Sequence, residues 1–134
     1  MRPCPGESQT LTGADGARVE ISACLDPQRP PRDVGPERIM YLSVRLKNTG
    51  VVPAPAMPAP GAGLLDVAGH VHSADLSRSL PSEPHPADDP QLEPGEQADW
   101  TLVVPVGRES PPLQFSVVLP MRGTPVARWF FPLD

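Results

Sequence analysis

Hydrophobic and polar residues alternate with a period of two in several short stretches of the chain. The clearest stretch is 39–48, in which the even-numbered residues from Met40 to Leu46 are apolar and most of their neighbours are polar. Successive side chains of a strand point to opposite faces, so this alternation predicts a strand with one buried face. Weaker or shorter versions of the same pattern occur at 9–12, 18–23, 64–67, 70–73, 98–106, 113–119 and 126–131.

Turn residues separate most of these stretches. Gly13-Ala14-Asp15-Gly16 and Ala68-Gly69 are typical of tight turns between neighbouring strands, and Glu93-Pro94-Gly95-Glu96 is typical of a turn that precedes a strand. The segments 26–37, 51–63 and 80–89 are rich in proline and are expected to be connections.

Proline is the unusual feature of the composition, with 21 of 134 residues. Proline is excluded from helix interiors and from central strands, so the chain has no comfortable window for a long helix. About seven to nine short antiparallel strands remain, and two sheets must pack face to face to cover their apolar sides. We therefore expect one all-β sandwich domain over residues 1–134, with residues 1–8 as an extension or tail.

The alternation also predicts which side chains form the core. They are Val19, Ile21, Met40, Leu42, Val44, Leu46, Trp100, Leu102, Val104, Leu113, Phe115 and Val117.

Several segments, in their order along the chain, resemble a known family. They are Asn48-Thr49-Gly50, Asp66-Val67-Ala68-Gly69, Leu92-Glu93-Pro94-Gly95-Glu96, Val103-Val104-Pro105 and Leu113-Gln114-Phe115-Ser116-Val117. Over roughly residues 7–120 the chain resembles immunoglobulin-like domains of unknown function in secreted and membrane-anchored proteins of Gram-positive bacteria. Those domains are relatives of the mycobacterial immunoprotective extracellular protein. The resemblance implies an immunoglobulin-like sandwich outside the cytoplasm with no catalytic role.

The net charge of -5 narrows the choice of partners. It argues against nucleic acid and against electrostatic docking to an anionic membrane, because both favour a basic surface. No run approaches the roughly 18 apolar residues of a membrane span. Residues 1–6 also lack the apolar stretch of a signal peptide, so the chain is either cytoplasmic or a trimmed mature portion. The expected partner is an unknown protein or a component of the cell envelope.

Cys4 and Cys24 are the two cysteines of the chain. A disulfide between them closes a loop of about 20 residues and contributes about 3 kcal/mol in the chain-entropy model. The alternation turns Cys24 away from the core face of its strand, which favours the bond, and two unpaired thiols are the alternative.

His70 and His72 are the most suggestive candidates for a metal site. On a strand, residues two apart point the same way, so both imidazoles could bind one zinc or copper ion. Further ligands would come from Asp75, Glu83, His85 or Met57. The alternative is that both histidines face solvent on one arm of a hairpin.

Other candidate chemistry has less support. The acidic residues Glu83, Asp88, Asp89, Glu93 and Glu96 lack the spacing of a calcium loop, so a solvated loop is favoured. A nucleophile elbow and a glycine-rich phosphate loop are absent from the sequence. No cofactor and no catalytic residue is therefore predicted.

The C-terminal aromatic residues Trp129, Phe130 and Phe131 are a candidate partner surface. Three successive aromatic residues on a strand must place at least one side chain on each face. The alternative is that both faces are covered there. The sequence as a whole predicts a non-enzymatic, extracytoplasmic binding or structural module. A zinc- or copper-binding cell-envelope protein using His70 and His72 is the alternative.

Overall fold

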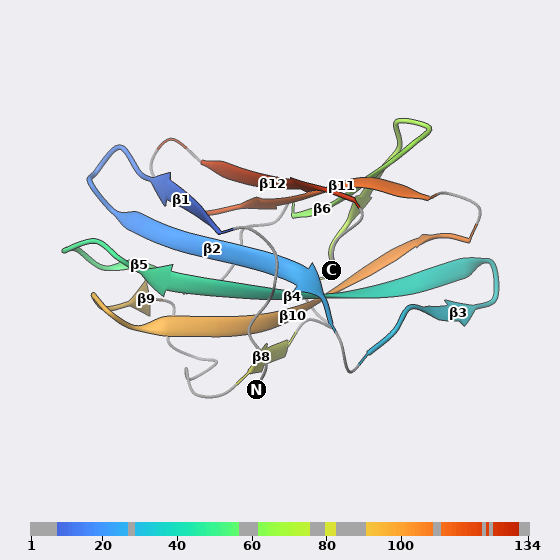
Figure 1. The fold of residues 1–134 in the computed structure, drawn as a ribbon, viewed down its shortest axis with the longest axis horizontal. Helices are drawn as coiled ribbons and strands as arrows, with labels where there is room; N and C mark the ends of the chain where they lie inside the picture. Colours follow the sequence, from blue (N-terminus) through green and yellow to red (C-terminus); the bar gives the residue numbers. More distant parts are fainter. Residues whose placement is uncertain are drawn as a thin grey trace.

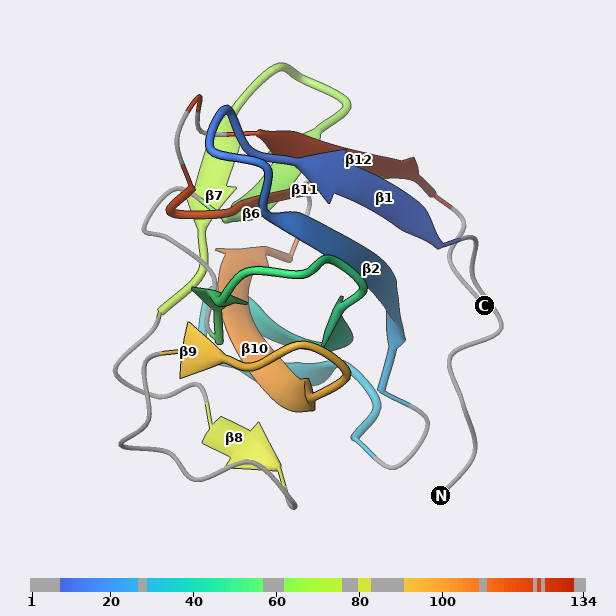
Figure 2. The same ribbon diagram turned by 90° about the vertical axis from the view of Figure 1, so that its left-hand side faces the viewer.

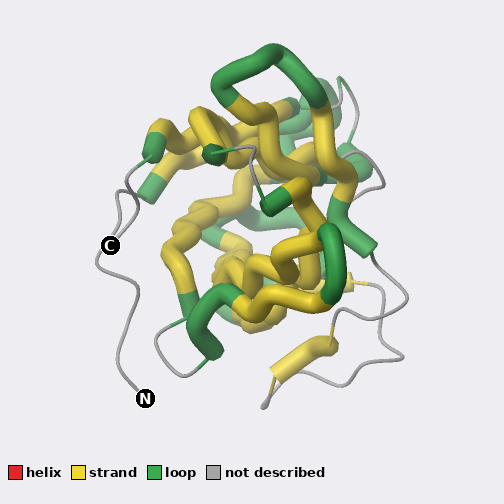
Figure 3. The backbone as a smooth tube through the Cα atoms, turned by 90° about the vertical axis from the view of Figure 1, so that its right-hand side faces the viewer, coloured by secondary structure: helices red, strands yellow, loops and turns green. Residues whose placement is uncertain are grey.

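The computed structural model describes residues 8–26, 29–56, 62–75, 80–82, 91–108, 111–121, 123 and 125–131. All of the regular elements in this part of the chain are strands joined by loops and turns (Figure 3). The strands are β1 (Gln9–Thr12), β2 (Arg18–Leu25), β3 (Arg32–Val34), β4 (Glu37–Asn48), β5 (Ala54–Pro55), β6 (Gly63–Asp66), β7 (Val71–Ser73), β8 (Leu80–Ser82), β9 (Gln91–Leu92), β10 (Gln97–Gly107), β11 (Pro112–Val118) and β12 (Val126–Phe130).

The described strands form two larger sheets and one small one. The larger sheet has the order β1-β2-β4-β10-β8, and β3 also pairs with β4. The second sheet has the order β12-β11-β6-β7, and β5 and β9 form a separate pair. The two larger sheets lie one over the other (Figures 1 and 2). One contains β2, β4 and β10, and the other contains β12, β11 and β6. The prediction of an all-β sandwich is confirmed.

The predicted strands occur where the alternation placed them. Three additional short strands, β3, β5 and β8, lie in segments that were expected to be connections, and a fourth, β9, directly precedes the predicted turn at 93–96. Each of them has two or three residues. Such short pairings form at sheet margins, where a proline such as Pro55 does not have to donate a backbone hydrogen bond.

The core lies between the two larger sheets, and all but one of the predicted core side chains are buried there. The exception is Leu113, which is 41% exposed. The register of β11 against β6 shifts between Pro112 and Gln114. A bulge at this point re-aims the side chain beside it, so the alternation that holds for Phe115 and Val117 fails at Leu113.

Asn48, the last residue of β4, is a buried polar residue that joins three segments. Its side chain donates hydrogen bonds to the carbonyl oxygens of Val52 (2.8 Å) and Leu92 (2.9 Å). Its amide oxygen accepts a hydrogen bond from the backbone of Gly50 at 2.9 Å. The residue is 1% exposed, and its two amide hydrogens and its oxygen are all engaged.

The main chain of Asn48 is held by the turn before β10. Its N–H donates to the carbonyl of Glu96, and its carbonyl accepts from the N–H of Gly95, both at 2.9 Å. Pro94 and Gly95 occupy the centre of this turn, and the φ of +87° at Gly95 favours glycine. The side chain of Glu96 closes the turn by accepting a hydrogen bond from the N–H of Glu93.

The two larger sheets are also linked at their margins. The side-chain amide of Gln9 in β1 donates to the carbonyl of Arg128 in β12 and accepts from the N–H of the same residue at 3.3 Å. On the other side, the N–H of Asp75 donates to the carbonyl of Val103 in β10 at 2.7 Å. The chain that leaves β7 therefore joins the larger sheet directly.

We predict that Asn48→Ala lowers the free energy of unfolding by about 3 kcal/mol, because it leaves two carbonyls and one N–H, all buried or part-buried, without their partner. Urea denaturation measures this loss. Thr49→Ala is the matched control, since Thr49 is exposed and follows directly in the chain, and it is expected to stay within about 0.5 kcal/mol of the parent. Equal effects of the two substitutions would contradict the structural role of Asn48.

Candidate functional site

The hairpin of β6 and β7 carries the histidines that the sequence analysis selected. Asp66 ends β6, and its N–H donates to the carbonyl of His70 at 2.9 Å. The N–H of Gly69 donates to the carbonyl of Asp66 at 3.0 Å, and Gly69 has a φ of +90°. This is a three-residue hairpin loop that ends in a glycine with left-handed backbone conformation. Residues that have a Cβ atom rarely adopt this conformation.

The carboxylate of Asp66 organises this hairpin. Its Oδ1 accepts hydrogen bonds from the backbone N–H groups of Ala68 and His70, both at 2.9 Å. Its Oδ2 lies 2.8 Å from Nε2 of His72 and 3.6 Å from Nδ1 of His70. The Asp66 side chain is 1% exposed, whereas the His70 side chain is 74% exposed. The hairpin therefore encloses a carboxylate that its own backbone and His72 satisfy.

These contacts change the acidity of Asp66. The hydrogen bond from His72 and the backbone hydrogen bond from His70 lower its pKa to about 2, against an opposing effect of burial. Hydrogen bonds that favour the charged form of a carboxyl group lower its pKa. Asp66 is thus ionised over a wide pH range.

The structure brings both histidines of the predicted metal pair to one carboxylate. His72 lies in β7 and His70 directly precedes that strand. Both imidazoles approach Oδ2 of Asp66, a residue that the sequence pattern did not indicate. No group of three or more His, Cys, Asp or Glu in the described part of the chain could hold a metal ion.

The other proposed ligands do not complete a described site. The backbone of Asp75 bonds to β10, and Met57, Glu83 and His85 lie outside the described residues. The zinc or copper site remains a prediction, which calorimetric titration of the parent and of the His70→Ala/His72→Ala double variant tests.

The acidic cluster considered for calcium is only partly described. Glu93 and Glu96 belong to the turn before β10, where Glu96 accepts a hydrogen bond from the backbone of Glu93. Glu83, Asp88 and Asp89 lie outside the described residues.

Cys24 lies near the end of β2, on the face opposite to Ala23 as the alternation requires. It is nevertheless buried, at 3% exposure, whereas Glu20 on the same face is exposed. Cys4 lies outside the described residues, so the disulfide remains a prediction.

The three C-terminal aromatic residues have different environments. Trp129 is buried and stacks on Phe115 of β11, with ring centroids 5.8 Å apart and an interplanar angle of 25°. Phe131 is partly buried against the core, and Phe130 is 65% exposed. Trp129 therefore belongs to the core, and Phe130 is the member of the three that offers a large apolar surface to solvent.

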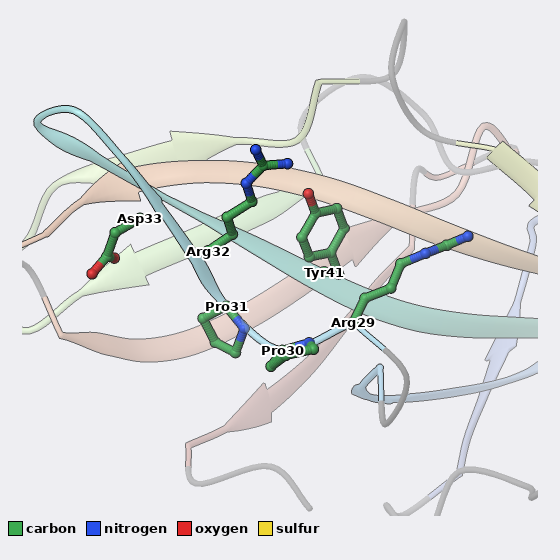
Figure 4. A pocket seen from close by; sticks show the side chains of 6 residues that line it. All are labelled: Arg29, Pro30, Pro31, Arg32, Asp33 and Tyr41. Carbon is green, nitrogen blue, oxygen red and sulfur yellow. The ribbon is translucent and has the colours of Figure 1, made fainter.

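An open hollow lies where β3 folds beside β4. It is lined by Arg29, Pro30, Pro31, Arg32, Asp33 and Tyr41. Figure 4 shows the ring of Tyr41 between the side chains of Arg32 and Arg29. The alternation of the sequence predicts only a connection at 26–37 and does not indicate this hollow, although Arg-Pro-Pro-Arg at 29–32 places two cations around two prolines.

The charges around the hollow are unequally satisfied. Asp33 accepts a hydrogen bond from Nε of Arg38 at 2.9 Å and lies 3.5 Å from Nη2 of Arg108. The hydrogen bond from Arg38 lowers the pKa of Asp33. Arg29 makes a longer contact of 3.8 Å with Asp26. The hollow therefore has two guanidinium groups, at Arg29 and Arg32, while its one carboxylate is already paired.

The described residues form an all-β sandwich. Asp66 is a structural carboxylate in the hairpin of β6 and β7, and the open hollow with Arg29 and Arg32 lies beside β3 and β4. Comparison of the chain with protein-family models, with curated proteins and with solved structures gave no match in any of the three. The described residues include no helix long and apolar enough to cross a membrane.

We predict that part of the stability of the domain depends on the ionisation of Asp66. Its folded-state pKa lies below the ordinary value of 3.8, so this contribution is present above about pH 4 and is lost as the pH falls toward 2. Asp66→Asn keeps an acceptor for the backbone but cannot ionise. Urea midpoints measured at pH 5, 4, 3 and 2 should decline less for this variant than for the parent.

The two histidines provide a matched comparison for this effect. His72→Ala removes the largest cause of the lowered pKa and should flatten the decline between pH 4 and 2. His70→Ala keeps the backbone N–H that bonds to Asp66, so its profile should stay close to that of the parent. A parallel decline in Asp66→Asn and the parent would contradict the assignment.

Proposed function

We propose that this chain is a non-enzymatic binding or structural module that works outside the cytoplasm. An immunoglobulin-like arrangement of the sandwich, implied by the sequence resemblance, belongs to the same proposal. Sandwiches of this kind serve many functions, so the proposal rests on the sites and not on the fold.

The observation that carries the proposal is the role of Asp66. Catalytic carboxylates and imidazoles need a free reactive edge that faces a substrate. In this hairpin, Asp66 is buried and binds two backbone N–H groups and His72, so its oxygens are occupied in holding the turn. A carboxylate and an imidazole in these positions support a structural role.

A second ion pair also supports a structural role. Nε of Arg45 on β4 donates to Oδ1 of Asp99 on β10 at 2.7 Å, and the two residues are direct partners in the sheet. Cross-strand pairs of opposite charge stabilise a sheet. The hollow with Arg29 and Arg32 differs from these two ion pairs, because its cations face solvent. The hollow therefore supports a binding role.

The compartment can be tested through the cysteines. We predict that protein purified from its native host under non-reducing conditions has a mass two hydrogens below that of the reduced chain, because Cys4 and Cys24 form a disulfide in an oxidising compartment. Peptide mapping by mass spectrometry identifies the bond. A native protein with two alkylatable thiols would contradict the extracytoplasmic assignment.

The same bond is expected to contribute to stability. Cys4→Ser/Cys24→Ser should lower the free energy of unfolding by about 3 kcal/mol relative to the oxidised parent. Reduction of the parent with dithiothreitol should give the same loss. A double variant as stable as the oxidised parent would show that the cysteines are not bonded.

A further inference from the structure

The hollow beside β3 combines two cations with an apolar base. Tyr41 is half-buried on the face of β4 that points away from the core, and its sheet partner Val103 is buried next to it. Arg32 pairs with Ile39, which lies two residues before Tyr41 on the same face of β4. The guanidinium of Arg32 is therefore placed at the margin of an apolar surface, where a bound anion would be partly shielded from water.

Arg32 is the cation that is available for a ligand. Its side chain has no hydrogen bond or ion pair within the described part of the chain, and the nearest carboxylate in sequence, Asp33, is shared by Arg38 and Arg108. Arginine binds carboxylates in a bidentate manner, and the phenol of Tyr41 offers one more donor. The second cation, Arg29, has only a 3.8 Å contact with Asp26. Because the whole chain carries a charge of -5, two arginines in one hollow form a local region of positive charge.

The backbone at the hollow favours an extended ligand. All residues of β3, Arg32–Val34, are exposed, and β3 pairs with β4 along one edge. No other described strand pairs with it. A free strand edge can accept an added strand, with backbone hydrogen bonds for affinity and side-chain contacts for selectivity. Pro30 and Pro31 restrict the approach to β3, which reduces the entropy lost on binding.

We propose that this hollow binds an extended acidic peptide segment of a partner protein. The segment adds to the free edge of β3, and its carboxylate side chains bind Arg29 and Arg32 beside Tyr41. This inference deepens the proposed function and depends on the chain being a binding module. The two guanidinium groups favour an acidic segment over a basic one, since opposite charges attract and like charges repel across an interface.

The test uses the full chain and a synthetic peptide in which glutamate alternates with valine. Binding is followed by fluorescence anisotropy, and the site is located by ¹H–¹⁵N correlation spectra. We expect saturable binding that shifts the amide resonances of residues 32–34 and Tyr41. Arg29→Gln/Arg32→Gln should weaken binding at least about tenfold, because both charge-assisted contacts are lost. Tyr41→Phe should weaken it about threefold through the loss of one hydrogen bond.

Matched controls separate the hollow from general electrostatics. Arg18→Gln/Arg128→Gln removes the same charge from exposed arginines elsewhere and should change the affinity less than about twofold. A peptide with glutamine in place of glutamate should bind at least about tenfold more weakly. Urea denaturation of both double variants verifies that they are folded.

Four results would overturn the inference. The first is no saturable binding at up to about 1 mM peptide. The second is equal weakening by the two double variants. The third is inorganic phosphate that displaces the peptide at equal concentration while the resonances of β3 do not move, which would indicate a simple anion site. Peptide-induced shifts confined to the face around Phe130 would also overturn the hollow as the site, but would leave the proposed binding module in place.

Discussion

The buried side-chain amide of Asn48 is the contact on which one whole end of this sandwich depends. At this residue β4 ends, the chain turns into the proline-rich segment, and β9 and the turn before β10 return to the same place. A single amide with two donors and one acceptor satisfies the carbonyl groups of Val52 and Leu92 and the N–H of Gly50. The indole of Trp100 adds a similar contact, since its Nε1 donates to the carbonyl of Ala56 at 2.7 Å.

This arrangement gives a physical meaning to two of the segments that suggested a family resemblance. Asn48-Thr49-Gly50 and Leu92-Glu93-Pro94-Gly95-Glu96 are far apart in the sequence, yet they form one hydrogen-bonded unit. Leu92 contributes a fully buried side chain and Gly95 the left-handed backbone of the turn. The two motifs are therefore parts of one structural unit.

The sequence predicted the long strands well because burial of one face imposes a strict period of two. It failed where the environment of a residue depends on a distant strand. Leu113 has the correct parity for the core, but the bulge against β6 turns it outward. The spacing of His70 and His72 also does not reveal Asp66, which lies close to both imidazoles because β6 pairs with β7. The hollow at Arg29–Asp33 exists because β3 folds onto β4, a tertiary pairing that the local pattern of a proline-rich segment does not contain.

The amide of Gln9 has a consequence for how the molecule behaves among its own copies. β12 is the outer strand of its sheet, and such a strand exposes backbone donors and acceptors to which a second chain can add. At Arg128, both backbone groups are already taken by the two ends of one glutamine side chain, which imitates the peptide group of a neighbouring strand. A side chain from β1 thus blocks this position of β12 against pairing with a second copy of the chain. The solubility of the protein at high concentration would then depend on this one side chain.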